Sequence, residues 1–381
     1  MQDRMRTGRF VKIAILILFV LLWSRFNGTG AAGEYAPVSG PCNLKFPLDH
    51  ASHPDYRLEW WYYTGNLIAQ DGERYGFQIT FFRIRTVPVG VEKSRPKRSS
   101  AWRTVQVIAA HAALSDISGK VFYHAEKMSR AAMNLAGARE QNDGFEVFVN
   151  GWNATIASHA HKLSAAAKEF SYTLDLVPRK EPVPHGDAGY SRKGEEQGEA
   201  SCYYSITRLD VSGKILVGGR EKNVSGAAWM DHEFSSAPLS LHLAGWDWFG
   251  LQLSDGSDLM VYMMRQKDGS LNPVSSGTYV GANGKALHIG AGDFRVQELS
   301  SWKSPHSGAV YPASWLLEIL PLDLRLKIVP KMADQELQTT ESTRVNYWEG
   351  SVGVEGSGKK DQRLYGEGYA ELTGYAGGVG F

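Results

Sequence analysis

Short segments in which apolar and polar residues alternate recur along the chain. This period of two is the pattern of β-strands with one buried face, and it predicts strands at residues 75–85, 145–156, 170–177, 203–209, 259–265 and 315–320. Dipeptides typical of hairpin turns lie between such segments: Asp71-Gly72, Ser118-Gly119, Ser212-Gly213, Asp255-Gly256 and Asp268-Gly269. The best helical candidates, residues 126–138 and 163–170, are short. The pattern predicts an all-β antiparallel sandwich or barrel.

Two stretches of the sequence resemble each other. WWYYTGNLIAQDGERYGFQITFFR (60–83) and WDWFGLQLSDGSDLMVYMMR (246–265) each contain an aromatic strand, an Asp-Gly turn, an apolar strand and a closing Arg. Duplication explains this as two similar β-domains that begin with the same hairpin, whereas composition alone is the other explanation. The length of 381 residues suits two domains or one large all-β domain. Duplication predicts a first domain over 40–236 and a second over 237–381.

The N-terminus has the order of regions found in a secretory signal peptide. Basic residues come first, an apolar run follows at 13–23, and small residues extend through 28–33. The apolar run is shorter than the ~20 residues that a bilayer span prefers. We therefore expect residues 1–32 to be a signal peptide, with an uncleaved anchor as the alternative, and the mature chain to be periplasmic or secreted. Membrane contact is expected only through an uncleaved leader.

Charge and cysteine content exclude some classes of function. The formal net charge is +1, and the basic run KSRPKR at 93–98 is local and contains a proline, so we predict a solvated loop and no nucleic-acid partner. Cys42 and Cys202 form no CxxC motif, which argues against a zinc finger. In an oxidising compartment they can form a disulfide; two separate buried thiols are the alternative. The polar segment 178–198 is long enough to be a lid or a disordered excursion.

Each of the two similar hairpins ends in an arginine that is in register with apolar residues. Arg83 follows the alternation of the first hairpin, and Arg265 that of the second. An inward-facing guanidinium requires a partner. One hypothesis lays it over a Trp of the same hairpin by a cation–π contact. The other uses it to recognise an anionic group of a ligand.

Two short stretches combine carboxyl groups with aromatic residues. In Glu59-Trp60-Trp61-Tyr62-Tyr63, alternation places Glu59 on one face with Trp61, and Trp60 and Tyr62 on the other. Among stacked aromatics, burial can raise the pKa of Glu59 and make it a general acid. Pairing with a nearby Arg is the alternative.

The second stretch is Trp229-Met230-Asp231-His232-Glu233. An extended backbone puts Trp229, Asp231 and Glu233 on one face and His232 on the other, and either face can line a cavity. The two carboxyl groups can share a proton, or one can protonate a substrate while the other stays ionised. A metal site would need further ligands, for which only His159 and His161 suggest themselves, so we expect neither metal nor cofactor. An alternative structural role is a brace between the domains, with Asp231 or Glu233 paired to Arg83 or Arg265.

Five ordered motifs resemble one known family. They are HPDYRLEWWYYTGNL (53–67), ASCYYSITRLDVSGKI (200–215), VSGAAWMDHEFSS (224–236), GWDWFGLQLSDG (245–256) and YWEGSVGVEG (347–356). The chain resembles, from about 46 to 375, the lipocalin-like family of attachment-type (AttH-like) secreted proteins and carotenoid 1,2-hydratase. The resemblance implies two lipocalin-like antiparallel β-barrels in tandem.

The resemblance also implies a chemistry. Family members add water across alkenes or assist polyene cyclisation, and many exported ones are called secreted hydrolases. Carried onto this chain, Asp231 becomes the preferred proton donor, His232 or Glu233 orients it or activates water, and aromatic side chains line the cavity. The expected cavity aromatics are Trp60, Trp61, Tyr62, Trp229, Trp246 and Trp248. No GxSxG motif supports a nucleophilic hydrolase.

We therefore expect an exported two-barrel protein that binds an apolar or amphipathic small molecule and acts as a hydratase-type lyase or a hydrolase. Whether it is an enzyme at all is open from sequence. A non-catalytic lipid carrier and a cell-surface attachment protein are the alternatives, because wide lipocalin cavities and dense aromatics suit a carrier equally.

Overall fold

A computed structural model describes residues 34–94, 100, 103–141, 144–157, 159–196, 198–237, 240 and 242–377. The predicted leader at 1–32 and residues 95–98 of the basic run lie outside these ranges. Within them, no helix is long and apolar enough to cross a membrane. The helical elements of the described residues are α2 (Val89–Ser94) and three 3₁₀ turns at Leu48–His50, Leu320–Leu322 and Lys359–Asp361.

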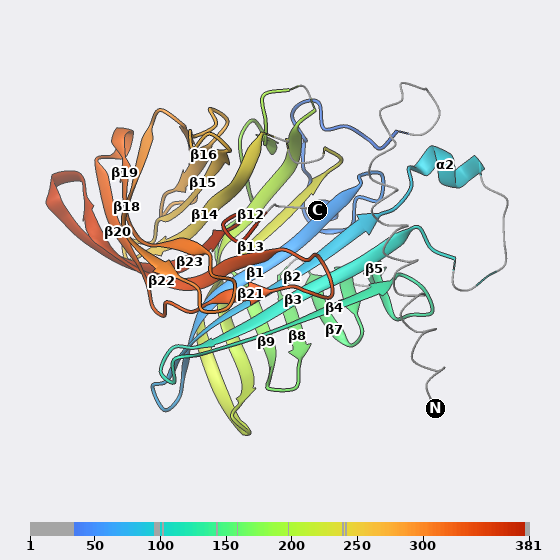
Figure 1. Ribbon diagram of the computed structural model, residues 1–381, viewed down its shortest axis with the longest axis horizontal. Helices are drawn as coiled ribbons and strands as arrows, with labels where there is room; N and C mark the ends of the chain where they lie inside the picture. Colours follow the sequence, from blue (N-terminus) through green and yellow to red (C-terminus); the bar gives the residue numbers. More distant parts are fainter. Residues whose placement is uncertain are drawn as a thin grey trace.

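The first of two antiparallel sheets nearly closes into a barrel (Figure 1). Its order is β4-β3-β2-β1-β13-β12-β9-β8-β7-β6-β5, and the short β10 and β11 pair with β12. The strands are β1 (Leu58–Ala69), β2 (Arg74–Arg85), β3 (Gln106–Asp116), β4 (Val121–Arg130), β5 (Ala136–Gln141), β6 (Gly144–Val149), β7 (Trp152–Ala157), β8 (His161–Ala166), β9 (Phe170–Pro178), β10 (Val183–Pro184), β11 (Tyr190–Arg192), β12 (Ala200–Val217) and β13 (Arg220–Ser235).

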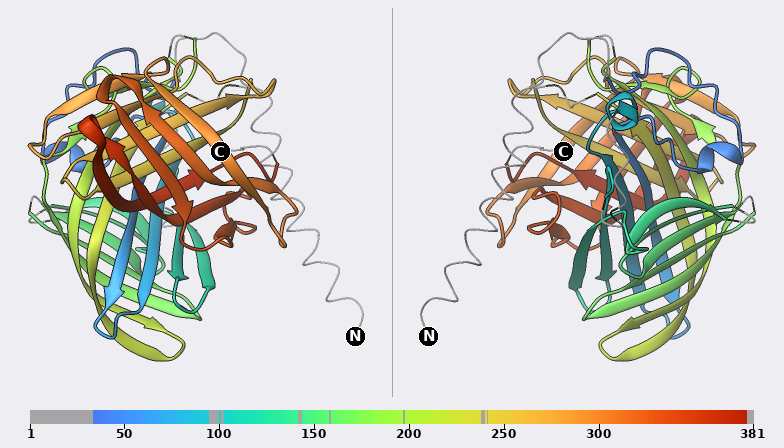
Figure 2. Two further views of the ribbon diagram at one scale, coloured as in Figure 1. Left: turned by 90° about the vertical axis from the view of Figure 1, so that its left-hand side faces the viewer. Right: turned by 90° about the vertical axis from the view of Figure 1, so that its right-hand side faces the viewer.

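The second sheet curves into a half-barrel that lies against the first (Figure 2). Its order is β17-β16-β15-β14-β23-β22-β20-β19-β18, with β21 pairing with β22. The strands are β14 (Leu243–Leu253), β15 (Asp258–Gln266), β16 (Ser276–Val280), β17 (Ala286–Gly290), β18 (Phe294–Lys303), β19 (Val310–Ile319), β20 (Leu324–Pro330), β21 (Glu336–Gln338), β22 (Asn346–Gly358) and β23 (Gln362–Leu372). The prediction of two tandem barrels is confirmed.

Each barrel has its own apolar core, and a third cluster lies between them. Trp61 and Trp152 are buried in the first core, and Trp315 and Trp348 in the second. The third cluster, which we call the seam, packs the outer face of one barrel on that of the other; it contains Tyr62, Tyr203, Trp229, Leu243, Trp248, Met260, Tyr262, Met264, Val274 and Tyr369, with Trp60 and Trp246 packed against it. Strand alternation produces this division, because the strands at the contact, among them β1, β13, β14 and β23, send one face into their own barrel and the other to the seam.

Buried hydrogen bonds cross the seam and fix the position of one barrel on the other. The Gln252 amide donates to the carbonyls of Thr207 (2.7 Å) and Ala228 (2.8 Å). In the opposite direction, the Asn66 amide donates to the Gly368 carbonyl at 3.2 Å. Buried amides left without partners would be costly, so these bonds favour one relative placement of the barrels.

The two similar stretches form the predicted hairpins, β1–β2 and β14–β15, with turns at Asp71-Gly72 and Asp255-Gly256. Other local predictions were wrong. The helical candidates 126–138 and 163–170 are strands and their connections (β4, β5, β8 and β9), because sheet pairing outweighs local helix propensity. Segment 145–156 is not one strand but the hairpin β6–β7, and Ser212-Gly213 lies inside β12, whose turn falls at Gly218-Gly219.

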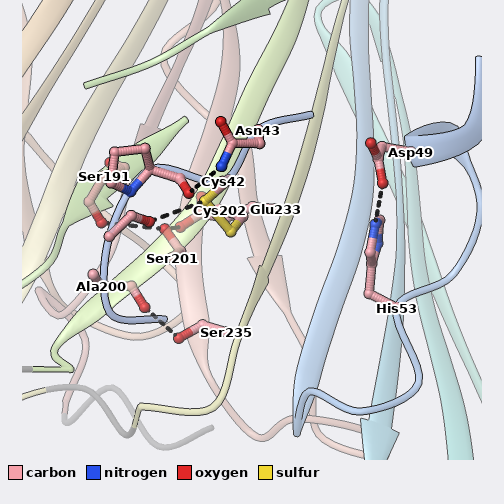
Figure 3. The surroundings of a disulfide bond; sticks show 12 residues. Cys42, Asn43, Asp49, His53, Ser191, Ala200, Ser201, Cys202, Glu233 and Ser235 are labelled. Atoms are coloured by element: carbon pink, nitrogen blue, oxygen red, sulfur yellow. Dashed lines mark hydrogen bonds and ion pairs between the residues drawn. A yellow bond between two sulfur atoms is a disulfide. The ribbon is translucent and has the colours of Figure 1, made fainter. Parts of the chain in front are cut away.

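A disulfide joins Cys42 to Cys202, as one of the two alternatives predicted (Figure 3). It connects the N-terminal segment to β12, and the Cys42 amide donates to the Ala188 carbonyl at 3.1 Å. The polar segment 178–198, which contains β10 and β11, is therefore held between the N-terminal segment and the barrels. Its side chains reach the second barrel as well, since Lys180 pairs with Asp258 at 2.6 Å.

Candidate functional site at the seam between the barrels

The stretch 229–233 forms part of β13 and presents its two faces to different environments. Asp231 and Glu233 face the seam with Trp229, whereas His232 points into the first barrel and stacks on Trp61. The predicted alternation is thus confirmed. In the sheet, Asp231 lies opposite Tyr62 of β1 and Ser205 of β12.

Asp231 is buried and accepts three hydrogen bonds. Tyr203 Oη donates to Oδ2 at 2.7 Å, and the Trp229 indole N–H donates to Oδ1 at 2.6 Å. The Ser205 hydroxyl also donates to Oδ1. Burial raises the pKa of Asp231 to about 7, although these three hydrogen bonds act in the opposite direction. Both protonation states of Asp231 are therefore populated near neutral pH.

Aromatic side chains from both barrels surround this carboxyl group. Trp248 of β14 donates its indole N–H to Tyr203 Oη at 3.1 Å. Its ring lies edge-on to Tyr62 at 5.4 Å and to Trp229 at 6.0 Å between centroids. Tyr62 and Trp248 are buried, whereas Trp60 and Trp246, two residues earlier on the same strands, are half-buried. Solvent therefore reaches the seam at this end, which we call the seam mouth.

The second barrel supplies two carboxyl groups that the sequence analysis missed. Glu349 of β22 and Glu371 of β23 are directly opposite each other in the sheet. Tyr62 Oη donates to Glu349 Oε1 across the seam at 2.6 Å. Burial raises the pKa of Glu349 well above its usual range and that of Glu371 to about 8, and the nearby carboxyl groups add to both effects.

Glu233 is held at the seam mouth by a cation from segment 178–198. Lys193 Nζ lies 2.8 Å from Glu233 Oε1, and the Ser201 hydroxyl donates to the same oxygen (Figure 3 shows Ser201 and Glu233 beside the disulfide). The ammonium also lies over the rings of Tyr203 and Tyr262, at 4.9 and 4.6 Å. The predicted brace to Arg83 or Arg265 was therefore wrong, because a lysine from another segment occupies the position beside Glu233.

Glu59 belongs to a different network, at one end of the first barrel. Its Oε2 lies 2.6 Å from Arg83 Nε, and both side chains are fully buried. Its Oε1 lies 2.8 Å from His53 Nδ1 and 2.9 Å from His232 Nε2. Burial alone would raise the pKa of Glu59, but hydrogen bonds with His232 and His53 and the Arg83 charge hold it well below its usual range. Glu59 is thus ionised, which does not suit the predicted general acid.

The ligand atoms of His53, Glu59 and His232 lie within 4.8 Å of one another, which is close enough for a metal ion. The Arg83 guanidinium already neutralises Glu59, so a divalent cation would add charge to a buried site. Asp231 and Glu233 are not part of this group, and of the predicted histidine ligands His161 contacts Tyr63 inside the first barrel at 2.9 Å.

Arg265 mirrors Arg83 in the second barrel. It pairs with Asp247 at 2.9 Å and lies over the Tyr375 ring at 3.8 Å. The prediction of an arginine over a Trp of its own hairpin was wrong for both, because a carboxylate in each first strand offers an ion pair. With these pairs formed, neither Arg83 nor Arg265 faces the seam as a ligand-binding group.

Comparison with known proteins identifies the family. A family model described as AttH-like matches residues 37–375. The chain belongs to the AttH-like family. A crystal structure of an AttH protein from Nitrosomonas europaea is 36% identical, covers 89% of this chain and 99% of that one, and superposes with a TM-score of 0.78. A search of curated protein sequences found no match.

More distant structures share the fold of this AttH-like chain. Kievitone hydratase from Nectria haematococca is 14% identical, with a TM-score of 0.67 and coverage of 92% of this chain and 99% of that one. CghA, solved with Sch210972, is 12% identical, with a TM-score of 0.51 and coverage of 93% and 97%. At these identities the likeness concerns the fold alone, which is the lipocalin-like fold of hydratase-type proteins.

Asp231 is expected to make the AttH-like protein less stable as the pH rises. Its pKa is about 7 in the folded protein and about 3.9 in an unfolded chain. Folding therefore favours the protonated form, so this contribution is complete below about pH 4 and is lost as the pH rises through 7. The free energy of unfolding of Asp231→Asn, measured in urea from pH 4 to 8, should fall less than that of the wild type. Asp175→Asn, at an exposed carboxylate of β9, should follow the wild type; an unchanged slope for Asp231→Asn would contradict the prediction.

Proposed function

We propose that this AttH-like protein is a hydratase-type lyase that adds water to a carbon–carbon double bond of an apolar or amphipathic small molecule at the seam. The observation that carries the proposal is the Asp231 carboxyl group, which is buried among Tyr62, Tyr203, Trp229 and Trp248 and has a pKa of about 7. A group with a pKa near the working pH is suited to proton transfer. The shared fold with kievitone hydratase supports the same class of reaction.

The surroundings of Asp231 suit the charges that such a reaction develops. Addition of a proton to an alkene leaves a carbocation, and the faces of Trp and Tyr rings stabilise cations. The half-buried Trp60 and Trp246 at the seam mouth offer apolar surface to an arriving ligand. The barrel interiors are filled by their own cores, including Trp61 and Trp152, whereas the aromatic pair Trp60 and Trp246 is only half-buried at the seam mouth. This supports a seam site over the carrier alternative.

A hydrolase is the second candidate, because a serine and a histidine are adjacent at the seam. His185 Nε2 lies 2.6 Å from Ser205 Oγ, and His185 Nδ1 lies 2.8 Å from Thr278 Oγ1. The Ser205 hydroxyl donates to Asp231 rather than to His185, which is not the arrangement of an activated nucleophile. Covalent labelling of Ser205 by a serine-reactive fluorophosphonate would favour the hydrolase; absence of labelling would favour the lyase.

We also propose that the protein is exported. The Cys42–Cys202 disulfide supports this, since disulfides persist mainly in oxidising compartments.

The test compares full-length wild type, Asp231→Asn and the exposed control Asp175→Asn on a panel of polyenes, phenolic alkenes and esters. Addition of water is followed by the mass increase of the product. Asn cannot exchange the proton, so turnover should fall about 100-fold or more, while the control keeps wild-type turnover. Equal turnover of wild type and Asp231→Asn on an alkene would remove Asp231 from the mechanism.

A further inference from the structure

Glu349 and Glu371 form a pair of carboxyl groups on the second barrel that faces Asp231 across the seam. They are opposite neighbours on β22 and β23, where side chains are about 5 Å apart at Cβ and two like charges destabilise each other. Trp248 is the neighbour of Glu371 on β14, and the Tyr62 hydroxyl bonds Glu349. The pair and Asp231 thus contact the same aromatic cluster from opposite sides.

Charge balance indicates which of these groups hold protons. Lys193 is the cation beside them, and it already pairs with Glu233. If Glu349, Glu371 and Asp231 were all ionised, two buried negative charges and a half-buried one would have no cation of their own among the described residues, and burial of unpaired charge is expensive. At least part of this charge must be removed by protonation.

Hydrogen bonding distinguishes Asp231 from Glu349, whereas the half-buried Glu371 accepts a hydrogen bond from Trp246 that acts against the rise of its pKa. Asp231 accepts bonds from Tyr203, Ser205 and Trp229, and donors of this kind favour an ionised carboxylate. Glu349 accepts one bond, from Tyr62, and its Oε2 is buried without a hydrogen-bond partner in the described part of the chain. The free energy of desolvation at that position is larger for an ionised carboxylate than for a protonated carboxyl group. The protonated form also has a proton that it can give to a ligand.

We infer that the Glu349–Glu371 pair is the proton donor of the seam site and that Asp231, on the other barrel, is the base that receives the proton of water. This inference rests on the proposed function. Asp231 was predicted from the sequence to be the proton donor, and here it is the base instead. The difference arises because Glu349 and Glu371 lie next to Asp231 only in the folded protein.

The step balances without a further reactant. An O–H bond of the pair breaks as a C–H bond forms on one alkene carbon, and the other carbon becomes a cation. The oxygen of water forms a bond to that cation, and one water proton passes to the Asp231 carboxylate. Because donor and base lie on opposite sides of the seam, hydrogen and hydroxyl add to opposite faces of the double bond. The proton then returns from Asp231 to the pair through solvent at the seam mouth.

The pH dependence follows from the groups that face one another here. The pair is faced by Tyr62, Asp231, Glu233 and Lys193, and Tyr347 and Tyr369 lie on its own strands. The pKa of Asp231 is about 7 and that of Glu371 about 8. The base must be ionised and the donor protonated, so kcat/KM should be bell-shaped with its maximum between these values. In Asp231→Asn, the fall of kcat/KM on the acidic side of the profile should disappear. In Glu371→Gln, the fall on the alkaline side should disappear.

The deciding experiment uses infrared difference spectra of the full chain at pH 7.5 and needs no substrate. The wild-type-minus-Glu371→Gln spectrum should contain the C=O stretch of a protonated carboxyl group, and wild type minus Glu349→Gln provides the same test if the first variant does not fold. The control Glu355→Gln, at an exposed carboxylate of β22, should remove only a carboxylate band. Ionised glutamates in both difference spectra would overturn the inference.

Turnover in D₂O distinguishes failure of this inference from failure of the proposed function. With an alkene that the wild type hydrates, deuterium and hydroxyl should be anti, and Glu371→Gln should slow turnover about 100-fold. If the wild type adds deuterium and hydroxyl syn while Asp231→Asn is inactive, the inference is overturned but the proposed lyase function stands. Wild-type turnover in both variants would remove the seam from the mechanism and so overturn the proposed site, whereas a wild type that hydrates no alkene of the panel would overturn the proposed function.

Discussion

Arg83→Met is expected to lower the free energy of unfolding by about 3–5 kcal/mol, the cost of removing one partner of a buried ion pair. Arg83 and Glu59 are both fully buried at 2.6 Å, and Arg83 also donates to the carbonyls of His53 and Tyr56. Without the guanidinium, Glu59 remains charged inside the barrel or must take up a proton. Because the pKa of Glu59 is depressed in the wild type, its stabilising effect is present above its unfolded pKa and is lost as the pH falls. The decrease in the free energy of unfolding caused by Arg83→Met should therefore be smallest at low pH.

Urea denaturation at several pH values measures this effect. Glu59→Gln combined with Arg83→Met should cost less than the sum of the two single changes, since no charge is then left unpaired. Arg325→Met serves as the matched control, because Arg325 pairs with Glu318 at an exposed position of the second barrel and should cost less than about 1 kcal/mol. A loss for Arg83→Met no larger than that of the control would contradict the prediction.

Removal of the disulfide is the second large expected effect. Cys42 and Cys202 are separated by 160 positions, and release of a loop of that size costs up to about 5 kcal/mol by the chain-entropy estimate, with typical losses of 2–4 kcal/mol. The Cys42→Ser/Cys202→Ser double variant should therefore unfold at a lower urea concentration than the oxidised wild type.

Reduced wild type provides the control for the disulfide, because it keeps both sulfur atoms but not the bond. The reduced wild type should unfold at a urea concentration close to that of the double variant. Hydrogen exchange should also increase at Cys42, whose amide is bonded to the Ala188 carbonyl, if the disulfide holds the N-terminal segment on segment 178–198. Equal urea midpoints for oxidised and reduced protein would show that the bridge adds no stability.

Local sequence was sufficient to predict the β-architecture and the faces of key strands. The alternation in Trp229 to Glu233 correctly separated Asp231 from His232, because side-chain direction in a strand depends only on the backbone. The similar hairpins were predictable for the same reason, as each carries its turn residues in its own sequence. Local helix propensity failed at 126–138, where pairing in the hairpins β3–β4 and β5–β6 determines the structure.

The partners across the seam were not predictable from one stretch. Glu349 and Glu371 meet Asp231 only because two barrels pack on each other, and nothing in a strand pattern specifies which outer faces come together. A signal did exist in the sequence. Tyr347-x-Glu349 and Tyr369-x-Glu371 each place an aromatic residue and a carboxyl group on the same strand face, as Trp229-x-Asp231 does. Likewise, Lys193 was hidden in a segment whose composition suggested only a polar loop.

The amides of Gln252 and Asn66 hydrogen-bond across the seam and hold the two barrels in one relative position. In the mechanism that we propose, the proton donor and the base come from different barrels, so neither half contains a complete set of reactive groups. A substitution that shifts one barrel relative to the other by a fraction of a strand spacing would abolish turnover, although each barrel would remain folded. Selection on such a protein would thus act on the docking of its two barrels as strongly as on the reactive residues themselves.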